Sequence, residues 1–138
     1  ITTLPLGKGE VLREGSDLAI IAVGCTVHPA LQAAQKLADE GIGAKVINAR
    51  FIKPLDAELI LNTAASIKKI LTVEENVLDG GFGSAVLELL AENGVTGATV
   101  KRLGIRNQFV EHAKPSELRS SLGLDEEGIL QAAREYGR

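Results

Sequence analysis

Glycines Gly80, Gly81 and Gly83 separate a strand-like segment, "KKILTVEE" (68–75), from a helix-like segment, "SAVLELL" (84–90). Backbone N–H groups at a helix N-terminus form a cradle for phosphate, because the helix dipole favours negative charge there. The stretch is not a P-loop, which needs a Lys and a Ser or Thr after its last glycine. Its spacing also differs from the dinucleotide fingerprint. The glycines therefore favour close packing of a helix start over a nucleotide site.

Two acidic residues, Glu74 and Glu75, stand shortly before these glycines. Together with Asp79 they are expected to repel an anion that approaches the helix start. A strand end is where ligands gather in open α/β sheets, and two carboxylates there are candidates for general acid–base chemistry. Neighbouring strand residues point to opposite faces, however, so the pair is not expected to share a site. We expect one carboxylate to face a partner surface and the other to be solvated.

Cys25, His28 and His112 are the remaining candidates for nucleophilic or metal chemistry. Cys25 precedes a helix, where the pKa of a thiol falls, and His28 follows three residues later. A working nucleophile also needs an oxyanion site and an orienting group, and these three residues lack the paired spacing of zinc ligands. His112, beside Glu111, lies after the last predicted strand, where a histidine bonded to solvent or a carbonyl is favoured. The residues predict no catalytic, cofactor-binding or metal-binding group in this chain.

Strand-like and helix-like segments alternate along the chain. The apolar run "LAIIAV" (18–23) is typical of a strand that is buried on both faces. Thr26 and Asp56 are expected to cap helices, and Gly41 and Gly94 to end them. The predicted strands lie within 9–13, 18–23, 44–51, 68–75 and 98–105, and the predicted helices within 26–41, 56–66, 82–94, 115–122 and 125–136.

This order predicts an α/β fold with three layers, α/β/α, around a mostly parallel sheet of about five strands. The first strand is separated from the second by a tight turn at Gly15–Asp17, so it is expected at an edge and antiparallel. No repeat, low-complexity segment or linker interrupts the pattern. Residues 1–138 are therefore predicted to form a single domain.

Composition excludes several functional classes. The net charge of −3 is small, Lys and Arg are scattered, and there is no Trp, so a nucleic-acid surface is not predicted. No apolar run has the length of a membrane span. A single Cys fits a reducing compartment, and a cytoplasmic location is expected. The chain begins at Ile1 and contains no Met, which favours a fragment of a longer chain.

Three stretches resemble a known family: "LAIIAVGCTVHPALQAAQKLADEGIGAKVINARFIKPLD" (18–56), "LTVEENVLDGGFGSAVLELL" (71–90) and "FVEHAKPSELRSSLGLDEEGI" (109–129). They are similar to the C-terminal domain of transketolase-type thiamine-diphosphate enzymes. That group includes transketolase, the beta subunits of 2-oxo-acid dehydrogenases and 1-deoxy-D-xylulose 5-phosphate synthase. The segments "GGFGSAV", "EHA" and "LRSSLGLDEEGI" are most similar to the synthases, and "LPLGKGEVLREG" resembles the end of their middle domain.

The resemblance implies a longer enzyme that condenses pyruvate with glyceraldehyde 3-phosphate. This reaction releases CO2 and forms deoxyxylulose 5-phosphate for isoprenoid and thiamine biosynthesis. It also implies that thiamine diphosphate and Mg²⁺ bind to other domains, because the Gly-Asp-Gly…Asn motif of the first domain is absent from this sequence. Residues 1–138 would then be a noncatalytic scaffold, inactive alone, that packs on those domains and helps to form a homodimer.

The resemblance also implies a contact surface at the glycine segment, with Phe82 at the centre of an apolar face that the other domains or a second subunit cover. The residues expected at this surface are Glu74, Glu75, Gly80, Gly81, Phe82, Gly83 and His112. Arg106, Asn107 and Ala113 depart from the synthase pattern, so the resemblance implies no role for these three residues. Two alternatives remain open: a domain of a transketolase or a 2-oxo-acid dehydrogenase beta subunit, and a stand-alone regulatory module that binds a small anion.

Overall fold

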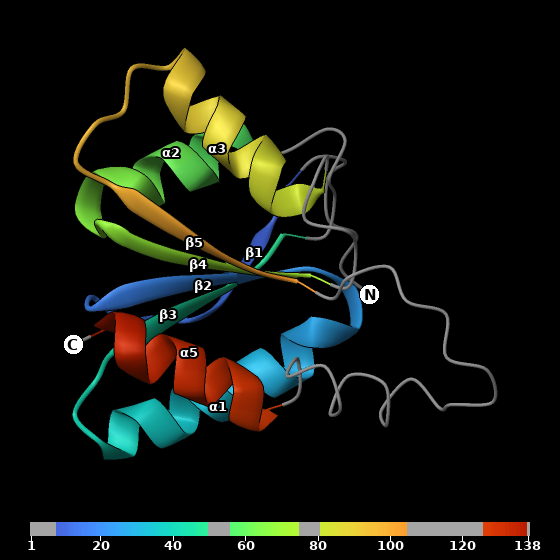
Figure 1. The fold of residues 1–138 in the computed structure, drawn as a ribbon, viewed down its shortest axis with the longest axis vertical. Helices are drawn as coiled ribbons and strands as arrows, with labels where there is room; N and C mark the ends of the chain where they lie inside the picture. The colour runs from blue at the N-terminus through green and yellow to red at the C-terminus, as the bar shows by residue number, and fades with distance from the viewer. Residues whose placement is uncertain (1–7, 50–55, 75–80, 105–125, 138) are drawn as a thin grey trace, which may run out of the picture.

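The computed structural model describes residues 8–49, 56–74, 81–104 and 126–137. In this part of the chain one five-stranded sheet lies between two layers of helices (Figure 1). The strands are β1 (Glu10–Arg13), β2 (Leu18–Ala22), β3 (Ala44–Asn48), β4 (Lys69–Glu74) and β5 (Thr99–Gly104). The helices are the 3-10 turn η1 (Gly24–Thr26), α1 (Val27–Asp39), α2 (Ala57–Ser66), α3 (Phe82–Glu92) and α5 (Glu126–Gly137).

The strands lie in the order β1-β3-β2-β4-β5. Strand β2 runs parallel to both β3 and β4, and β5 runs parallel to β4. Strand β1 is antiparallel and lies at an edge, paired with β3. The predicted α/β class, with a mostly parallel sheet and one antiparallel edge strand, is confirmed. The sequence did not indicate which strand β1 pairs with. Strand β1 pairs with β3 because β3 and β4 already occupy both edges of β2.

The turn between β1 and β2 is held against the start of β3. The backbone N–H of Asp17 donates to the carbonyl oxygen of Gly43 at 2.8 Å, and the N–H of Gly43 donates to Oδ2 of Asp17 at 2.6 Å. A Cβ on Gly15 would lie 2.5 Å from the carbonyl carbon of Ala44. No side chain fits in that space, so the two backbones can approach this closely because residue 15 is glycine.

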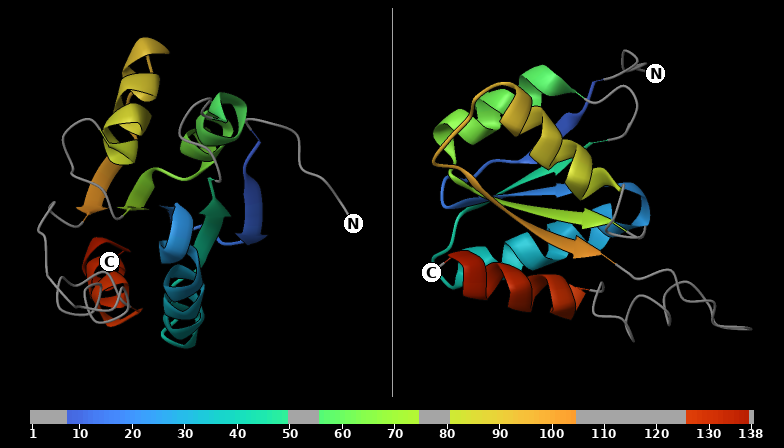
Figure 2. Two further views of the ribbon diagram at one scale, coloured as in Figure 1. Left: turned by 90° about the vertical axis from the view of Figure 1, so that its right-hand side faces the viewer. Right: turned by 45° about the horizontal axis from the view of Figure 1, so that its top comes forward.

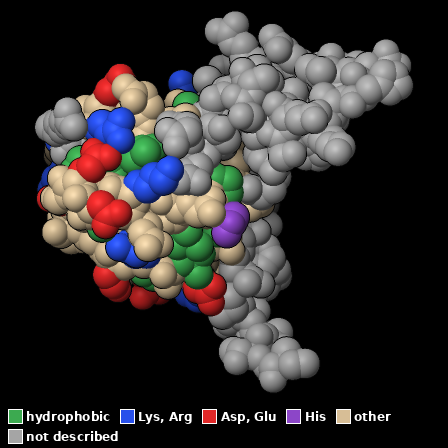
Figure 3. All heavy atoms as spheres, turned by 90° about the horizontal axis from the view of Figure 1, so that it is seen from below, with side chains coloured by type: hydrophobic (Ala, Val, Ile, Leu, Met, Phe, Trp, Pro, Cys, Tyr) green, Lys and Arg blue, Asp and Glu red, His purple; other side chains and the backbone are tan. Residues whose placement is uncertain are grey.

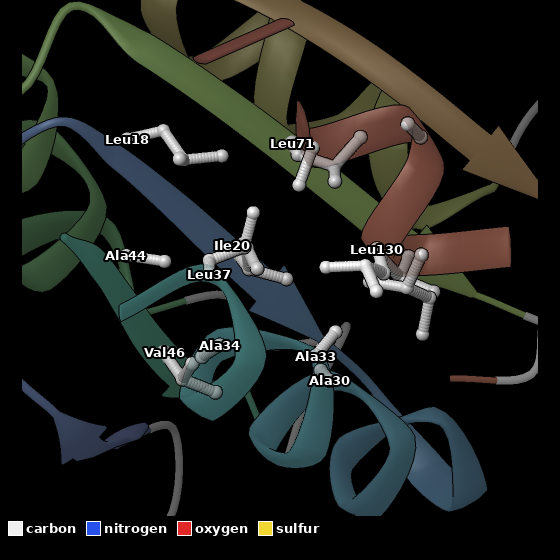
Figure 4. Close-up of a cluster of buried hydrophobic side chains, with 14 of the residues drawn as sticks. Leu18, Ile20, Ala30, Ala33, Ala34, Leu37, Ala44, Val46, Leu71 and Leu130 are labelled. Carbon is white, nitrogen blue, oxygen red and sulfur yellow. The ribbon is translucent and has the colours of Figure 1, made fainter. Parts of the chain in front are cut away.

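The sheet divides the core into two apolar clusters. Figure 2 shows α1 and α5 on one side of the sheet and α2 and α3 on the other. Successive residues of β2 point to opposite faces, so Leu18 and Ile20 face α1 and α5, whereas Ala19 and Ile21 face α2 and α3. Figure 4 shows the first cluster, in which side chains of α1 and α5 meet those of β2, β3 and β4. Strand β2 is buried on both faces, which explains why all of its residues are apolar.

The predicted helix boundaries are mostly confirmed. Asp56 caps α2, since its Oδ1 accepts from the N–H of Leu59 at 3.2 Å. Gly41 and Gly94 follow α1 and α3 with φ of 84° and 67°, the left-handed conformation that favours glycine. Thr26 precedes α1 as predicted, but its side chain makes no capping bond. The predicted helix at 115–122 lies outside the described residues.

Helix α5 is joined to the end of α1 by a bidentate ion pair. Nε and one terminal nitrogen of Arg134 donate to the two carboxylate oxygens of Glu40, at 2.8 and 2.7 Å. Both side chains are about a third exposed (30% and 32%), which limits screening by solvent. Replacing Arg134 with alanine is expected to lower the free energy of unfolding by about 1 kcal/mol, measured by urea denaturation.

The matched control is Lys8→Ala, because Lys8 forms a longer and more exposed pair with Glu58, at 3.7 Å. Exposed pairs of this kind contribute almost nothing, so this variant is expected to unfold like the native chain. Equal losses in the two variants would show that the Arg134–Glu40 geometry adds no stability.

The face formed by α1 and α5 carries charges of both signs. Figure 3 views this face and shows Lys and Arg side chains interspersed with Asp and Glu. Among the described residues, no helix is long and apolar enough to cross a membrane.

Candidate functional site

Glu74 is the last residue of β4, and its side chain is buried with 1% exposure. Along β4, Leu71 and Val73 point to α1 and α5. Glu74 is an even-numbered residue of the strand and faces the other layer, where its carboxylate reaches the start of α3. One oxygen accepts from the N–H of Phe82 at 2.6 Å, and the other accepts from the N–H of Gly83 at 3.0 Å.

This carboxylate caps α3. The N-cap residue of α3 is Gly81, which has no side chain to accept the first free N–H groups. Glu74, eight residues before Phe82 in the chain, satisfies two of them and places a negative charge at the positive end of the helix dipole. The N–H groups that a phosphate would need are therefore already bonded to the protein's own anion.

The position of Glu74 differs from our prediction. We expected its carboxylate at a partner surface or in solvent, whereas it is buried inside the domain. The reason is that Glu74 points to the side of the sheet that α2 and α3 cover, where the free N–H groups of Phe82 and Gly83 at the start of α3 donate to its carboxylate. The signal in the sequence was the glycine at the N-cap position: it has no side chain, so another residue must cap α3. Glu75 lies outside the described residues.

Gly83 allows α3 to lie close to β4 and β5. A Cβ at this position would lie 2.7 Å from Cγ of Arg102 and 2.9 Å from Oγ1 of Thr72. Arg102 also donates to Oγ of Ser84, in the first turn of α3, at 3.0 Å. The close packing that the glycines predicted is present at Gly83, where the neighbouring atoms are side chains of the same domain rather than another backbone.

The exposure of Phe82 also differs from our prediction. We expected it at the centre of an apolar face left open for a partner, but its side chain is 0% exposed. It packs in the core cluster between the sheet and the helices α2 and α3, with Val86 and Leu90 of the same helix. Phe82 is the first residue of α3 and points inward, because the Glu74 bonds draw the start of the helix onto the sheet. Its side chain stabilises this domain and does not form an exposed apolar face.

The other candidate residues do not form a site in the described part of the chain. Cys25 belongs to η1, and His28 is exposed in the first turn of α1. Gly80 and His112 lie outside the described residues, as do Arg106, Asn107 and Ala113. Within the residues that the structure describes, no group of three or more His, Cys, Asp or Glu could hold a metal ion.

Thr26 has a role that the sequence did not indicate. Its buried hydroxyl lies 2.7 Å from the carbonyl oxygen of Val23 and 3.1 Å from that of Val73, and it can donate to either. The same oxygen accepts from the N–H of Val23 at 3.2 Å. The carboxyl ends of β2 and β4, where ligands bind in many open α/β sheets, are thus tied together by the protein itself.

The comparison with known proteins agrees with this arrangement of strands and helices. A family model described as "Transketolase, C-terminal domain" matches residues 7–129. The chain belongs to the transketolase C-terminal domain family.

Bacterial relatives of this transketolase C-terminal domain share much of its sequence. It is 63% identical over 132 residues to "1-deoxy-D-xylulose-5-phosphate synthase" of Syntrophus aciditrophicus (strain SB), covering 96% of this chain and 20% of that protein. It is 58% identical over 133 residues to "1-deoxy-D-xylulose-5-phosphate synthase 1" of Geobacter sulfurreducens, covering 96% of this chain and 21% of that protein. The chain thus spans about a fifth of the length of these curated relatives.

Solved structures show the same fold. A "Split gene transketolase, inactive beta4 tetramer" matches with a TM-score of 0.88 and 35% identity, over 98% of this chain and 44% of that one. A transketolase from Pichia stipitis, solved in a complex with xylulose 5-phosphate, matches with a TM-score of 0.65 and 20% identity, over 95% of this chain and 18% of that one. The second likeness concerns the fold alone.

Proposed function

We propose that this chain is the C-terminal domain of a 1-deoxy-D-xylulose 5-phosphate synthase and serves as its scaffold. The observation that carries this proposal is the 63% identity over 132 residues to a synthase of which the chain covers 20%. The complete enzyme would condense pyruvate with glyceraldehyde 3-phosphate, release CO2 and form deoxyxylulose 5-phosphate. Its products would supply isoprenoid and thiamine biosynthesis, and its location would be the cytoplasm.

Thiamine diphosphate and Mg²⁺ would bind to other domains of that enzyme. The start of α3, which the glycines made the candidate for a diphosphate, does not fit this group, because the carboxylate of Glu74 occupies the N–H groups of Phe82 and Gly83. No catalytic step is therefore assigned to residues of this domain. The electron-withdrawing chemistry of the reaction would belong to the cofactor.

The task that remains for this domain is packing against the rest of its chain and against a second identical subunit. We propose the segment Gly80–Gly83, with Glu75 and His112, as part of this contact surface. Glu74 and Phe82 would support it from within the domain, since both side chains are buried. Gly81 is partly exposed at the start of α3, where backbone can meet a partner.

The experiment compares the complete synthase with a shortened form that lacks its C-terminal domain, the part that corresponds to residues 1–138 of this chain. We expect the complete enzyme to release CO2 from pyruvate in the presence of glyceraldehyde 3-phosphate and to sediment as a dimer. The shortened form is expected to lose dimerisation and at least 90% of this activity (about tenfold, or 1.4 kcal/mol). A shortened form that remains dimeric and fully active would overturn the scaffold function.

A transketolase is the second candidate, because the split-gene transketolase is 35% identical over 98% of the chain. The same preparation distinguishes the two: a transketolase moves a two-carbon unit from a ketose phosphate without releasing CO2. The relatives and solved structures named above are synthases and transketolases, and none of these is a 2-oxo-acid dehydrogenase beta subunit. A stand-alone anion-binding module would bind diphosphate, and calorimetric titration of the chain with diphosphate is expected to give no heat of binding.

A further inference from the structure

The N-terminus of α3 has more features of an anion site than its cap requires. The backbone N–H groups of Phe82 and Gly83 both donate to the Glu74 carboxylate, one to each oxygen. Oγ1 of Thr72, a fully buried atom on the same face of β4, has no hydrogen-bond partner within the described part of the chain. Buried hydroxyls without a partner are rare and call for an explanation. This hydroxyl lies 2.9 Å from the position of a Cβ on Gly83, so it is at the start of α3.

One cationic side chain, Arg102, lies beside this point. The guanidinium of Arg102 donates to Ser84 in the first turn of α3, and the stem of Arg102 passes directly over Gly83. The N-terminal end of the helix dipole adds a further partial positive charge. Backbone donors, a hydroxyl donor and a nearby arginine are the groups that proteins use to hold a carboxylate.

We propose that the start of α3 is a binding site for a small carboxylate anion, and that Glu74 occupies it in the native chain as a tethered ligand. The proposal is independent of the function proposed above. Glu74 is fixed to the end of β4 and uses two of the three donors, which leaves the hydroxyl of Thr72 unused. A free anion of the same charge is not held by a strand and can use all three.

The test removes the tethered ligand and supplies a free one. In Glu74→Ala, the two N–H groups lose their acceptor and a space of carboxylate size opens. The melting temperature of the 138-residue chain, whose two apolar clusters lie between its own sheet and helices, is expected to fall by roughly 10 °C. Sodium formate at about 0.5 M is expected to raise the melting temperature of this variant by roughly 4 °C more than that of the native chain in the same buffer.

Glu74→Gln is the matched control. Glutamine has the same size, so it fills the space, and its amide oxygen can accept one N–H while its NH₂ group opposes the other. This variant is expected to be destabilised but to respond to formate no more than the native chain. Pivalate, a carboxylate too large for the site, provides a control for the effect of salt on Glu74→Ala.

Thr72→Val tests the third donor. In the native background the hydroxyl has no partner, so this change is expected to leave the melting temperature within about 2 °C. In the Glu74→Ala background it is expected to raise the formate concentration needed for half of the effect by roughly fivefold, the value of one hydrogen bond.

A specific response of Glu74→Ala to formate, absent from Glu74→Gln, supports the site. Equal responses of both variants and the native chain would overturn it. If Glu74→Ala is unfolded at room temperature, the recovery of its helical circular dichroism on addition of formate replaces the melting temperature. No recovery under those conditions also overturns the proposal. If half-saturation does not change in Thr72→Val/Glu74→Ala, the hydroxyl is not part of the site.

Discussion

Replacing Phe82 with alanine is expected to lower the free energy of unfolding of this chain by about 4 kcal/mol. The side chain is fully buried between the sheet and α2 and α3, and it is among the largest side chains in the core. Alanine removes the ring and leaves a cavity, because the surrounding strands and helices are fixed by the sheet and can close over it only in part. The free energy is measured by urea denaturation of the 138-residue chain.

The control for Phe82→Ala is Leu87→Ala in the same helix. Leu87 is 39% exposed, so its removal is expected to cost less than about 1 kcal/mol. A similar loss in both variants would contradict the burial of Phe82. The burial of Phe82 would also be contradicted if Phe82→Ala prevented dimerisation of the complete enzyme without lowering the stability of the domain. That result would indicate the exposed apolar face predicted from the sequence.

Replacing Gly15 with alanine is expected to cost about 3 kcal/mol or more. A Cβ at this position would lie 2.5 and 2.7 Å from the carbonyl carbon and the nitrogen of Ala44, and 2.7 Å from the carbonyl carbon of Gly43. All three are backbone atoms, so no rotation of a side chain relieves the contact. The start of β3 must instead move away from the turn, which strains the hydrogen bonds between Asp17 and Gly43.

Gly97→Ala separates this steric effect from the effect of conformation. Gly97 has φ of 86° and no atom within 4 Å of its Cβ position, so alanine there meets no neighbour and costs about 1 kcal/mol through its backbone alone. Thermal denaturation of the two variants, side by side, measures the difference. If Gly15→Ala is no less stable than Gly97→Ala, the backbones at Gly15 and Ala44 are not as close as described.

Local patterns predicted most of the fold. The buried run of β2, the cap at Asp56 and the glycine at position 41 each depend on neighbouring residues, so they could be recognised in the sequence. The partner of β1 depended on which strands occupy the edges of β2, and no local pattern contains that information. Expectations of this second kind require knowledge of the whole sheet.

The candidate site was predicted less well, for a physical reason. From the sequence we expected the carboxylate of Glu74 to repel an anion at the glycines, but this carboxylate is itself the anion that the start of α3 binds. The decision depends on which face of β4 the side chain occupies and how near α3 begins. The N–H of Phe82 is bonded to the same carboxylate, and its side chain is buried as well. The predictions for Glu74 and Phe82 were therefore wrong together, because neither used the contact between the end of β4 and the start of α3.

The position of α5 has a consequence for synthesis of the protein on the ribosome. Arg134 of α5 contacts Glu40 at the end of α1, 94 residues earlier in the chain. Translation adds 5–20 residues per second, so the nascent chain carries α1 for roughly 5–20 s before α5 is made. During that interval the apolar side chains of α1 that α5 covers are open to chaperones and to other nascent chains. Among the described residues, the apolar cluster under α2 and α3 includes none beyond β5, so this layer can form first.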